Sequence, residues 1–282
     1  MGGNYYLETE TMNPAPQKEG KILCDLHAHP TLKANLEDIV NALQSPGMVG
    51  LTVKDIDRSG KDILRYEQAL DLLPSKSFQE IDKGKLAKCG QGYFARTQEI
   101  QAGLHHVLAL GWESAQYFPN FNTLKEAVKE IHAHKGIAIL NHPFALAVDH
   151  NIRLPKSREE EELIQTAYGS VDEIEVHNAY CIDLIPKVLA MKDANRRAEE
   201  LRLREFPTFI GTAGSDCHRR WNQVKITGIY LDKSRIEQKG MEGVKEAIIQ
   251  GNFTRWGDAE AGPYVSRGGF LLGVAGDMLS LI

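Results

Sequence analysis

Two histidines separated by one residue are the first candidates for chemistry in this sequence. The segment from Asp25 to His29 follows apolar residues that are typical of a buried strand. Alternate residues of a strand point to the same side, so the imidazoles of His27 and His29 are aimed at one point. Two ring nitrogens at this spacing suit a metal ion, although two histidines on an ordinary strand give the same pattern. The other candidate ligands therefore decide between these two interpretations.

Four further strand-like segments end on residues that a metal ion could bind. They are 107–113 with Glu113, 136–143 with His142, 171–177 with His177, and 209–218 with Asp216 and His218. Apolar strands separated by helical segments indicate a parallel sheet, and when such a sheet closes into a barrel its functional residues collect at the carboxyl ends of the strands. All of these candidates are expected at that end. His105 and His106, which precede the strand over 107–113, are expected at the opposite end.

Taken in order, these motifs resemble the PHP (polymerase and histidinol phosphatase) superfamily of metal-dependent phosphoesterases. The matching segments are 25–29, 47–57, Glu113, 142–143, His177 and 214–218. The resemblance extends from about residue 21 to residue 221 and keeps the order of motifs found in the family. It implies an α/β fold, a distorted (β/α)7 TIM-like barrel, with a metal site at the carboxyl ends of the strands.

The resemblance also implies two divalent ions, and ligands of this kind suit Zn, Mn or Fe without choosing among them. The first ion would be held by His27, His29, Glu113 and Asp216, and the second by Glu113, His142 and His177. The Glu113 carboxylate would bridge the two ions. Two ions about 3.5 to 4 Å apart can activate water and stabilise the leaving oxygen of a phosphoester. Hydrolysis without a covalent intermediate follows from this expectation.

Two further catalytic candidates have open roles. His218 either protonates the leaving alkoxide or hydrogen-bonds a ligand or phosphate, and the second role is favoured. Asp25 and Asp55 are interpreted as acceptors that orient ligand imidazoles. For Asp55 the alternative is an ordinary carboxylate in a polar loop.

One motif departs from the family pattern. In segment 47–57, Ile56 stands where the family has histidine, and Lys54 stands where it has threonine. No histidine occurs between Pro30 and Asp57. Members of the family with three metals use a histidine from each of these places together with the equivalent of His218. The sequence therefore predicts about two tightly bound ions.

Four cations beside the motifs could bind a substrate phosphate, or could be surface charges. They are Lys54, Arg58, Arg219 and Arg220. The leading substrate class is a small phosphomonoester, such as a sugar phosphate, a nucleotide or histidinol phosphate. The alternatives are a protein tyrosine phosphatase or an exonuclease on the same fold, or a metal-binding scaffold without catalysis. A formal charge of -5 gives no general attraction to nucleic acid or to an anionic membrane, so neither partner is expected.

The 282 residues suit one catalytic domain with additions. Residues 1–20 are expected to be an extended leader, 21–260 the barrel, 58–105 an insertion forming a lid or a packing extension, and 261–282 a C-terminal arm. The arm would dock on the barrel or on a second subunit, giving a homo-oligomer. Four cysteines without paired spacing and the absence of an apolar targeting segment favour a cytoplasmic enzyme. A helix is predicted over 123–135, where Thr123 and Glu126 form a capping box.

Overall fold

The computed structural model of the chain describes residues 16–32, 34–54, 63–74, 76–103, 105–144, 170–179, 194–218, 221 and 224–256. Its strands are β1 (Lys21–His29), β2 (Gly47–Lys54), β3 (Phe78–Asp82), β4 (Leu86–Cys89), β5 (Gly92–Ala102), β6 (His105–Leu110), β7 (Ile137–Asn141), β8 (Glu173–Asn178), β9 (Thr212–Gly214), β10 (Cys217–His218), β11 (Gly228–Asp232) and β12 (Thr254–Trp256). Its helices are α1 (Leu36–Gln44), α2 (Tyr66–Leu72), α3 (Leu124–Ala133), α5 (Ala194–Glu205), α6 (Lys233–Lys239) and α7 (Met241–Ile249).

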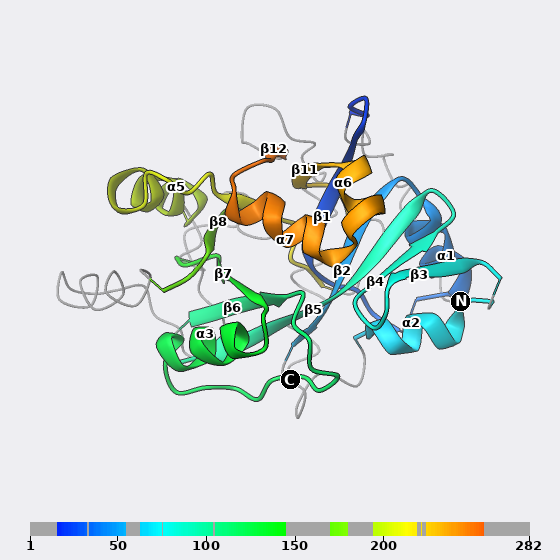
Figure 1. Cartoon of the computed structure of the whole chain (residues 1–282), viewed down its shortest axis with the longest axis horizontal. Helices are drawn as coiled ribbons and strands as arrows, with labels where there is room; N and C mark the ends of the chain where they lie inside the picture. Colours follow the sequence, from blue (N-terminus) through cyan, green and yellow to red (C-terminus); the bar gives the residue numbers. More distant parts are fainter. Residues whose placement is uncertain are drawn as a thin grey trace, which may run out of the picture.

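The strands form one curved sheet that nearly closes into a barrel (Figure 1). Neighbouring strands follow the order β12-β11-β1-β2-β5-β6-β7-β8-β9. The chain then turns from β9 into β10, which pairs in parallel with the end of β1 through Ala28 and Cys217. This return to the first strand confirms the predicted mixed α/β architecture, a distorted TIM-like barrel.

Along the sheet from β1 to β9, one strand, β6, runs against the others. β1, β2 and β5 are mutually parallel, and so are β7, β8 and β9. β6 lies between these two groups and is antiparallel to both β5 and β7. The sequence predicted parallel strands throughout, because a short apolar strand carries no signal of its direction. β6 therefore presents its first residues, and not its last, at the carboxyl ends of its neighbours.

The interior of the barrel is apolar at one end. Leu108 and Leu110 of β6 lie in a buried cluster that also contains side chains of β1, β2, β5, β7 and α7. The side chain of Lys245 on α7 donates to the carbonyl oxygen of Lys135, just before β7 begins. Helix α7 therefore covers the end of the barrel where β6 finishes and β7 starts. The opposite end is left for polar side chains.

The predicted insertion over 58–105 is shorter in the structure. Residues 92–102 form β5, which pairs with β2 from Gly92 to Glu99 and is a central barrel strand. Between β2 and β5, the described residues form α2 and the β3–β4 hairpin, and β4 pairs with the first half of β5. The addition therefore lies within residues 55–91, of which 55–62 and 75 are outside the described part. Whether it acts as a lid stays a prediction.

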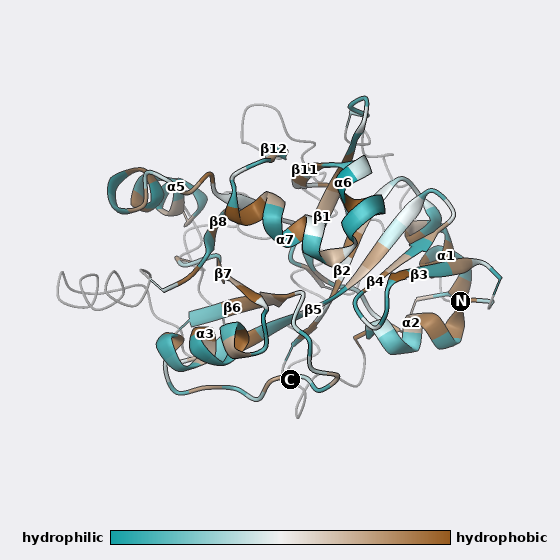
Figure 2. Cartoon of the chain, in the orientation of Figure 1, coloured by the Kyte–Doolittle hydropathy of each residue, from teal (hydrophilic) through white to brown (hydrophobic). Residues whose placement is uncertain are grey.

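The helices follow their sequence patterns. Thr123 caps α3 through a capping box with Glu126, as predicted, and α3 buries Leu124, Val128 and Ile131 against the outside of the barrel. Figure 2 shows α5 as mostly hydrophilic, which agrees with its charged sequence. Within the described ranges, none of the helices combines the length and the apolar character that a membrane span requires.

Candidate metal centre

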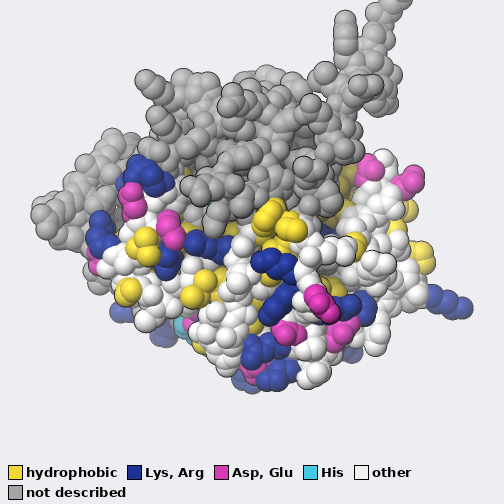
Figure 3. Space-filling model, turned by 90° about the horizontal axis from the view of Figure 1, so that it is seen from above, with side chains coloured by type: hydrophobic (Ala, Val, Ile, Leu, Met, Phe, Trp, Pro, Cys, Tyr) yellow, Lys and Arg dark blue, Asp and Glu magenta, His cyan; other side chains and the backbone are white. Residues whose placement is uncertain are grey.

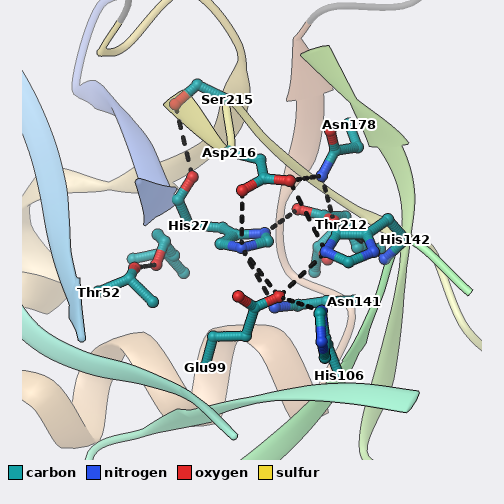
Figure 4. Close-up of polar contacts among 12 residues, drawn as sticks. His27, Thr52, Glu99, His106, Asn141, His142, Asn178, Thr212, Ser215 and Asp216 are labelled. Carbon is teal, nitrogen blue, oxygen red and sulfur yellow. Dashed lines mark hydrogen bonds and ion pairs between the residues drawn. The ribbon is translucent and has the colours of Figure 1, made fainter. Parts of the chain in front are cut away.

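Polar side chains gather inside the barrel at the end where β1, β5 and β7 finish and β6 begins (Figure 4). The buried members are His27, His29, Glu99, His106, Asn141, Glu175, Asn178 and Asp216, and His142 lies beside them. Burying so many polar groups is costly unless hydrogen bonds or a bound cation replace the lost water. The contacts among these side chains show which of the two applies at each position.

Three candidate ligand atoms form a nearly equilateral triangle. His27 Nε2 lies 3.3 Å from His29 Nε2, and Asp216 Oδ1 lies 3.4 Å from each of these nitrogens. Ligands of a tetrahedral ion with bonds of about 2.0 to 2.1 Å are separated by about 3.3 to 3.4 Å. The three atoms therefore have the spacing of one face of a tetrahedral metal site.

The second nitrogen of each imidazole fixes the position of its proton. His29 Nδ1 lies 2.9 Å from the carbonyl oxygen of Thr52, which can only accept, so Nδ1 carries the hydrogen. His27 Nδ1 likewise donates to Glu175 Oε1 at 3.0 Å. In the neutral imidazoles, both Nε2 atoms then present lone pairs to each other at 3.3 Å. This arrangement is repulsive unless one ring carries a second proton on Nε2 or a metal ion lies between them.

The pKa values of His27 and His142 also indicate that positive charge is favoured at this site. Burial lowers the pKa of His27, but the carboxylates of Glu175 and Asp216 outweigh burial and raise the pKa well above its usual range. The same balance raises the pKa of His142, where burial is opposed by Glu99 and Asp216. The surroundings of both imidazoles therefore favour a positive charge, which a proton or a metal ion can supply.

Glu99 of β5 is the carboxylate at the centre of the cluster. Its Oε1 lies 2.9 Å from His106 Nδ1 and 3.0 Å from His142 Nε2. Its Oε2 lies 3.3 Å from His29 Nε2 and 3.2 Å from Lys54 Nζ. Burial would raise the pKa of Glu99, but the surrounding imidazoles and the Lys54 ammonium hold it well below its usual range. Glu99 is thus ionised, with Oε1 facing His106 and His142 and Oε2 facing His29 and Lys54.

Asn178 ties two carboxylates of the cluster together. Its side-chain amide donates to Glu175 Oε2 at 3.0 Å and to Asp216 Oδ2 at 3.2 Å. Its backbone is held in turn by the amide of Asn195 on α5, through two hydrogen bonds of 3.0 Å. Glu175 Oε2 also accepts the backbone N–H of His142 at 3.1 Å. These contacts leave Asp216 Oδ1 facing the histidines.

Asp25 fixes the turn that carries Asp216. Its Oδ1 accepts the backbone N–H of Ser215 at 3.0 Å, and its Oδ2 accepts that of Lys225 at 2.9 Å. The backbone N–H of Asp216 donates to the carbonyl oxygen of His27 at 2.7 Å. The prediction that Asp25 orients a ligand imidazole was therefore wrong, because its oxygens are used by backbone groups. Glu175 and the carbonyl of Thr52 orient the imidazoles instead.

Backbone conformation at the site supports its close packing. A Cβ atom on Gly214 would lie 2.5 Å from Glu175 Oε1 and 2.7 Å from His27 Cβ, so only glycine fits there. Asp216 and His142 have φ values of 47° and 24°, a region that side chains with a Cβ seldom occupy. Such strain persists only where the surrounding structure holds the residue in place.

Glu113 does not reach the cluster. Its side chain is 51% exposed and pairs with Lys135 at 2.9 Å. Glu113 follows the end of β6, and because β6 is antiparallel to its neighbours this end lies beside the start of β7, away from the cluster. The expectation that Glu113 bridges two ions is therefore corrected, because the buried carboxylate among these histidines belongs to Glu99. His106 was placed at the wrong end of the barrel for the same reason.

The remaining predicted residues are only partly placed. Lys54 reaches Glu99, as given above. His177 lies on β8 two residues after Glu175 and is half-buried, and it belongs to none of the three groups of potential ligands found among the described residues. The backbone of His218 forms β10, beside the end of β1. Asp55, Arg58, Arg219 and Arg220 lie outside the described residues, as does Ile56.

Five buried residues of the cluster were missed from the sequence: Glu99, His106, Asn141, Glu175 and Asn178. β5 and β8 carry several polar residues each, so their sequences did not single out Glu99, Glu175 or Asn178. Glu99 was overlooked because its strand was assigned to an insertion. His106 was overlooked because the direction of β6 was assumed.

These residues fit a metal centre. Three groups of side chains could each hold an ion: His27, His29 and Asp216; Glu99, His106 and His142; and His27, His142 and Glu175. Glu99 Oε2 is buried and accepts no hydrogen bond from a described group. Imidazole and carboxylate ligands without thiolate suit Zn, Mn or Fe.

Comparison with known proteins supports the fold. No protein-family model and no curated protein matches the chain by sequence. Among solved structures, a lesion-specific endonuclease from Pyrococcus furiosus, PfuEndoQ, matches 84% of the chain at 14% identity and a TM-score of 0.50. The chain spans 59% of the length of that endonuclease. PsfC from Pseudomonas syringae PB-5123 matches 93% of the chain and 99% of its own length, at 13% identity and a TM-score of 0.55. The chain thus shares the near-closed barrel fold of PHP-family proteins.

Proposed function

We propose that the protein is a metal-dependent phosphoesterase whose two ions share the carboxylate of Glu99. The observation that carries this proposal is the triangle of His27 Nε2, His29 Nε2 and Asp216 Oδ1. Glu99 Oε2 lies beside this triangle, 3.3 Å from His29 Nε2. These four residues would hold the first ion. Glu99 would use its other oxygen, together with His142, for the second.

The remaining ligand of the second ion is assigned to His177, as the sequence suggested. β8 carries His177 to the same end of the barrel as Glu175, two residues later. His106 is the competing candidate, because it forms a group of potential ligands with Glu99 and His142 and its Nδ1 lies 2.9 Å from Glu99 Oε1. We assign His106 to positioning Glu99, and the number of ions bound by His106 and His177 variants tests this assignment.

Two divalent ions, when bound, would lower the pKa of a water molecule and stabilise negative charge on the phosphoryl oxygens. The chain itself supplies orientation. Glu175, Asn178 and the carbonyl of Thr52 hold the ligand side chains, so little reorganisation is needed when a substrate arrives.

Charge favours a phosphomonoester as the substrate. The described cluster contains the carboxylates of Glu99, Glu175 and Asp216 and the ammonium of Lys54. Two divalent ions would make this set positive, and a phosphomonoester dianion neutralises more of that charge than a phosphodiester does. Arg58, Arg219 and Arg220 remain candidates for further phosphate contacts.

A nuclease is the second candidate, because one structure with the same fold is an endonuclease. Two observations argue against it. The chain has a formal charge of -5. Among the described residues on the face shown in Figure 3, Lys and Arg side chains lie among Asp and Glu side chains and form no single basic stripe.

The test compares p-nitrophenyl phosphate with bis-p-nitrophenyl phosphate after exhaustive chelation and after re-addition of Mn, Zn or Fe. We expect metal-dependent hydrolysis with a clear preference for the monoester. Full activity after chelation would overturn the proposal. Tight metal binding without hydrolysis of either compound, or of a panel of phosphorylated metabolites, would favour a metal-binding scaffold, and preference for the diester would favour the nuclease.

A further inference from the structure

Lys54 is a second cation that is already built into the candidate metal centre. It is the last residue of β2 and is paired in register with Glu99 of β5. Its Nζ lies 3.2 Å from Glu99 Oε2, and its side chain is only 16% exposed. An ammonium group in such a position has lost most of its water, and the carboxylate of Glu99 contributes to compensating that loss.

The same oxygen of Glu99 also faces the proposed ligands of the first ion. Oε2 lies 3.3 Å from His29 Nε2, whose own lone pair is directed at that site. An ion bound there and the Lys54 ammonium would therefore share one carboxylate. Glu99 and Asp216 carry two negative charges against the three positive charges of a divalent ion and the ammonium. The two cations therefore repel each other and leave an excess of positive charge between them.

An anion bound beside both cations would relieve this repulsion. An ammonium group has three N–H donors, so it can keep its contact with Glu99 and donate to a further acceptor at the same time. A phosphate group carries several strong acceptor oxygens and charge to match, and hydrogen bonds between ionised groups are stronger than neutral ones. A phosphate oxygen placed beside Lys54 would join both cations.

We propose that Lys54 competes with the metal ion for Glu99 and, together with the ion, forms the subsite for the phosphate group of the substrate. Lys54 therefore has opposite effects on the affinity for the metal ion and on the affinity for phosphate. It weakens the binding of the first ion in the absence of substrate and strengthens the binding of phosphate once the ion is present. This inference rests on the proposed function, since it takes the metal centre as given.

Calorimetric titration measures both affinities without hydrolysis of a substrate. Mn²⁺ is titrated into metal-free protein, and inorganic phosphate into Mn-loaded protein, for the wild type and Lys54→Met. We expect the variant to bind the first Mn²⁺ about 3- to 10-fold more tightly, because a competing cation is gone. We expect it to bind phosphate at least about 10-fold more weakly, because a charged donor is lost.

Three further variants control for other causes. Lys129→Met makes the same change on the exposed surface of α3 and should leave both affinities unchanged. Lys54→Arg keeps the charge and should retain most of the phosphate affinity. Lys54→Gln provides a second neutral variant should Lys54→Met fail to give a cooperative thermal transition.

The outcomes separate this inference from the proposed function. If both affinities fall together in the neutral variants, Lys54 only supports the fold of the site, and the inference is overturned. It is also overturned if neither affinity changes while the wild type still hydrolyses phosphomonoesters, although the proposed function then survives. Opposite changes in a protein that shows no hydrolysis would support the phosphate subsite and count against the enzyme. A wild type that binds no Mn²⁺ would contradict both.

Discussion

Glu99 and Glu113 are carboxylates that lie near opposite ends of the β5–β6 pair, and they have opposite surroundings. The side chain of Glu99 is 1% exposed and lies within 3.6 Å of four histidines and a lysine. The side chain of Glu113 is 51% exposed and pairs with Lys135. The difference arises because β6 runs against its neighbours, so the residue that follows it is carried away from the cluster. Strand direction, and not residue type, therefore decides which glutamate can serve a metal ion.

The substitution with the largest expected effect tests this comparison directly. Glu99→Gln removes the charge shared by both ions, so we expect metal loss and a fall in phosphomonoester hydrolysis of at least about 100-fold. Glu113→Gln should leave the rate within about twofold, because exposed ion pairs contribute little. Metal content by mass spectrometry and initial rates measure both. Normal metal content and rate in Glu99→Gln would show that Glu99 is not the bridge.

A second prediction extends the comparison to the residues that hold the ligands. Asn178→Ala frees the carboxylates of Glu175 and Asp216, and losses of this kind lower metal affinity about 10- to 100-fold. Asn195→Ala acts one step further away and should cost less than about 10-fold. Competition with a fluorescent chelator measures both affinities. An affinity loss in Asn195→Ala larger than that in Asn178→Ala would contradict the proposed role of Asn178.

His106 and His177 give a third prediction, which sharpens the assignment of the second ion. We expect His177→Gln to bind about one ion per chain, because a ligand is lost. His106→Gln should still bind about two ions, with affinity lowered about 10-fold, because only the support of Glu99 is lost. Stoichiometry by mass spectrometry decides between them, and the reverse pattern would make His106 the ligand.

The smallest effect concerns Glu199, a carboxylate paired with arginines away from the cluster. Burial raises the pKa of Glu199, but Arg202 and Arg255 outweigh it and lower the pKa to about 2. A lowered pKa stabilises the fold above the ordinary glutamate pKa near 4.5, and that stability is lost as the pH falls toward 2. Glu199→Gln should therefore cost less than about 1 kcal/mol at pH 7.

Denaturant unfolding between pH 7 and pH 3 checks this prediction. The difference from the wild type should shrink below about pH 4.5, and metal content should stay unchanged at neutral pH. A difference that grows on acidification would contradict the sign given to the pKa shift.

The sequence predicted the architecture and half of the cluster. The barrel and the positions of His27, His29, His142 and Asp216 followed from motifs at strand ends, because a strand fixes the side and the end to which its residues point. Glu99 could not be found in this way, since it depends on which strands are neighbours and on the direction of β6. Both are set by tertiary pairing, which a short apolar segment does not encode.

Anomalous scattering from crystals grown with excess Mn²⁺ tests the central claim most directly. We predict two ions per chain at the end of the barrel where β5 and β7 finish, with the carboxylate of Glu99 coordinating both. Ions that do not contact Glu99, an ion beside Glu113, or a fully occupied third ion on His218 would contradict the proposed centre.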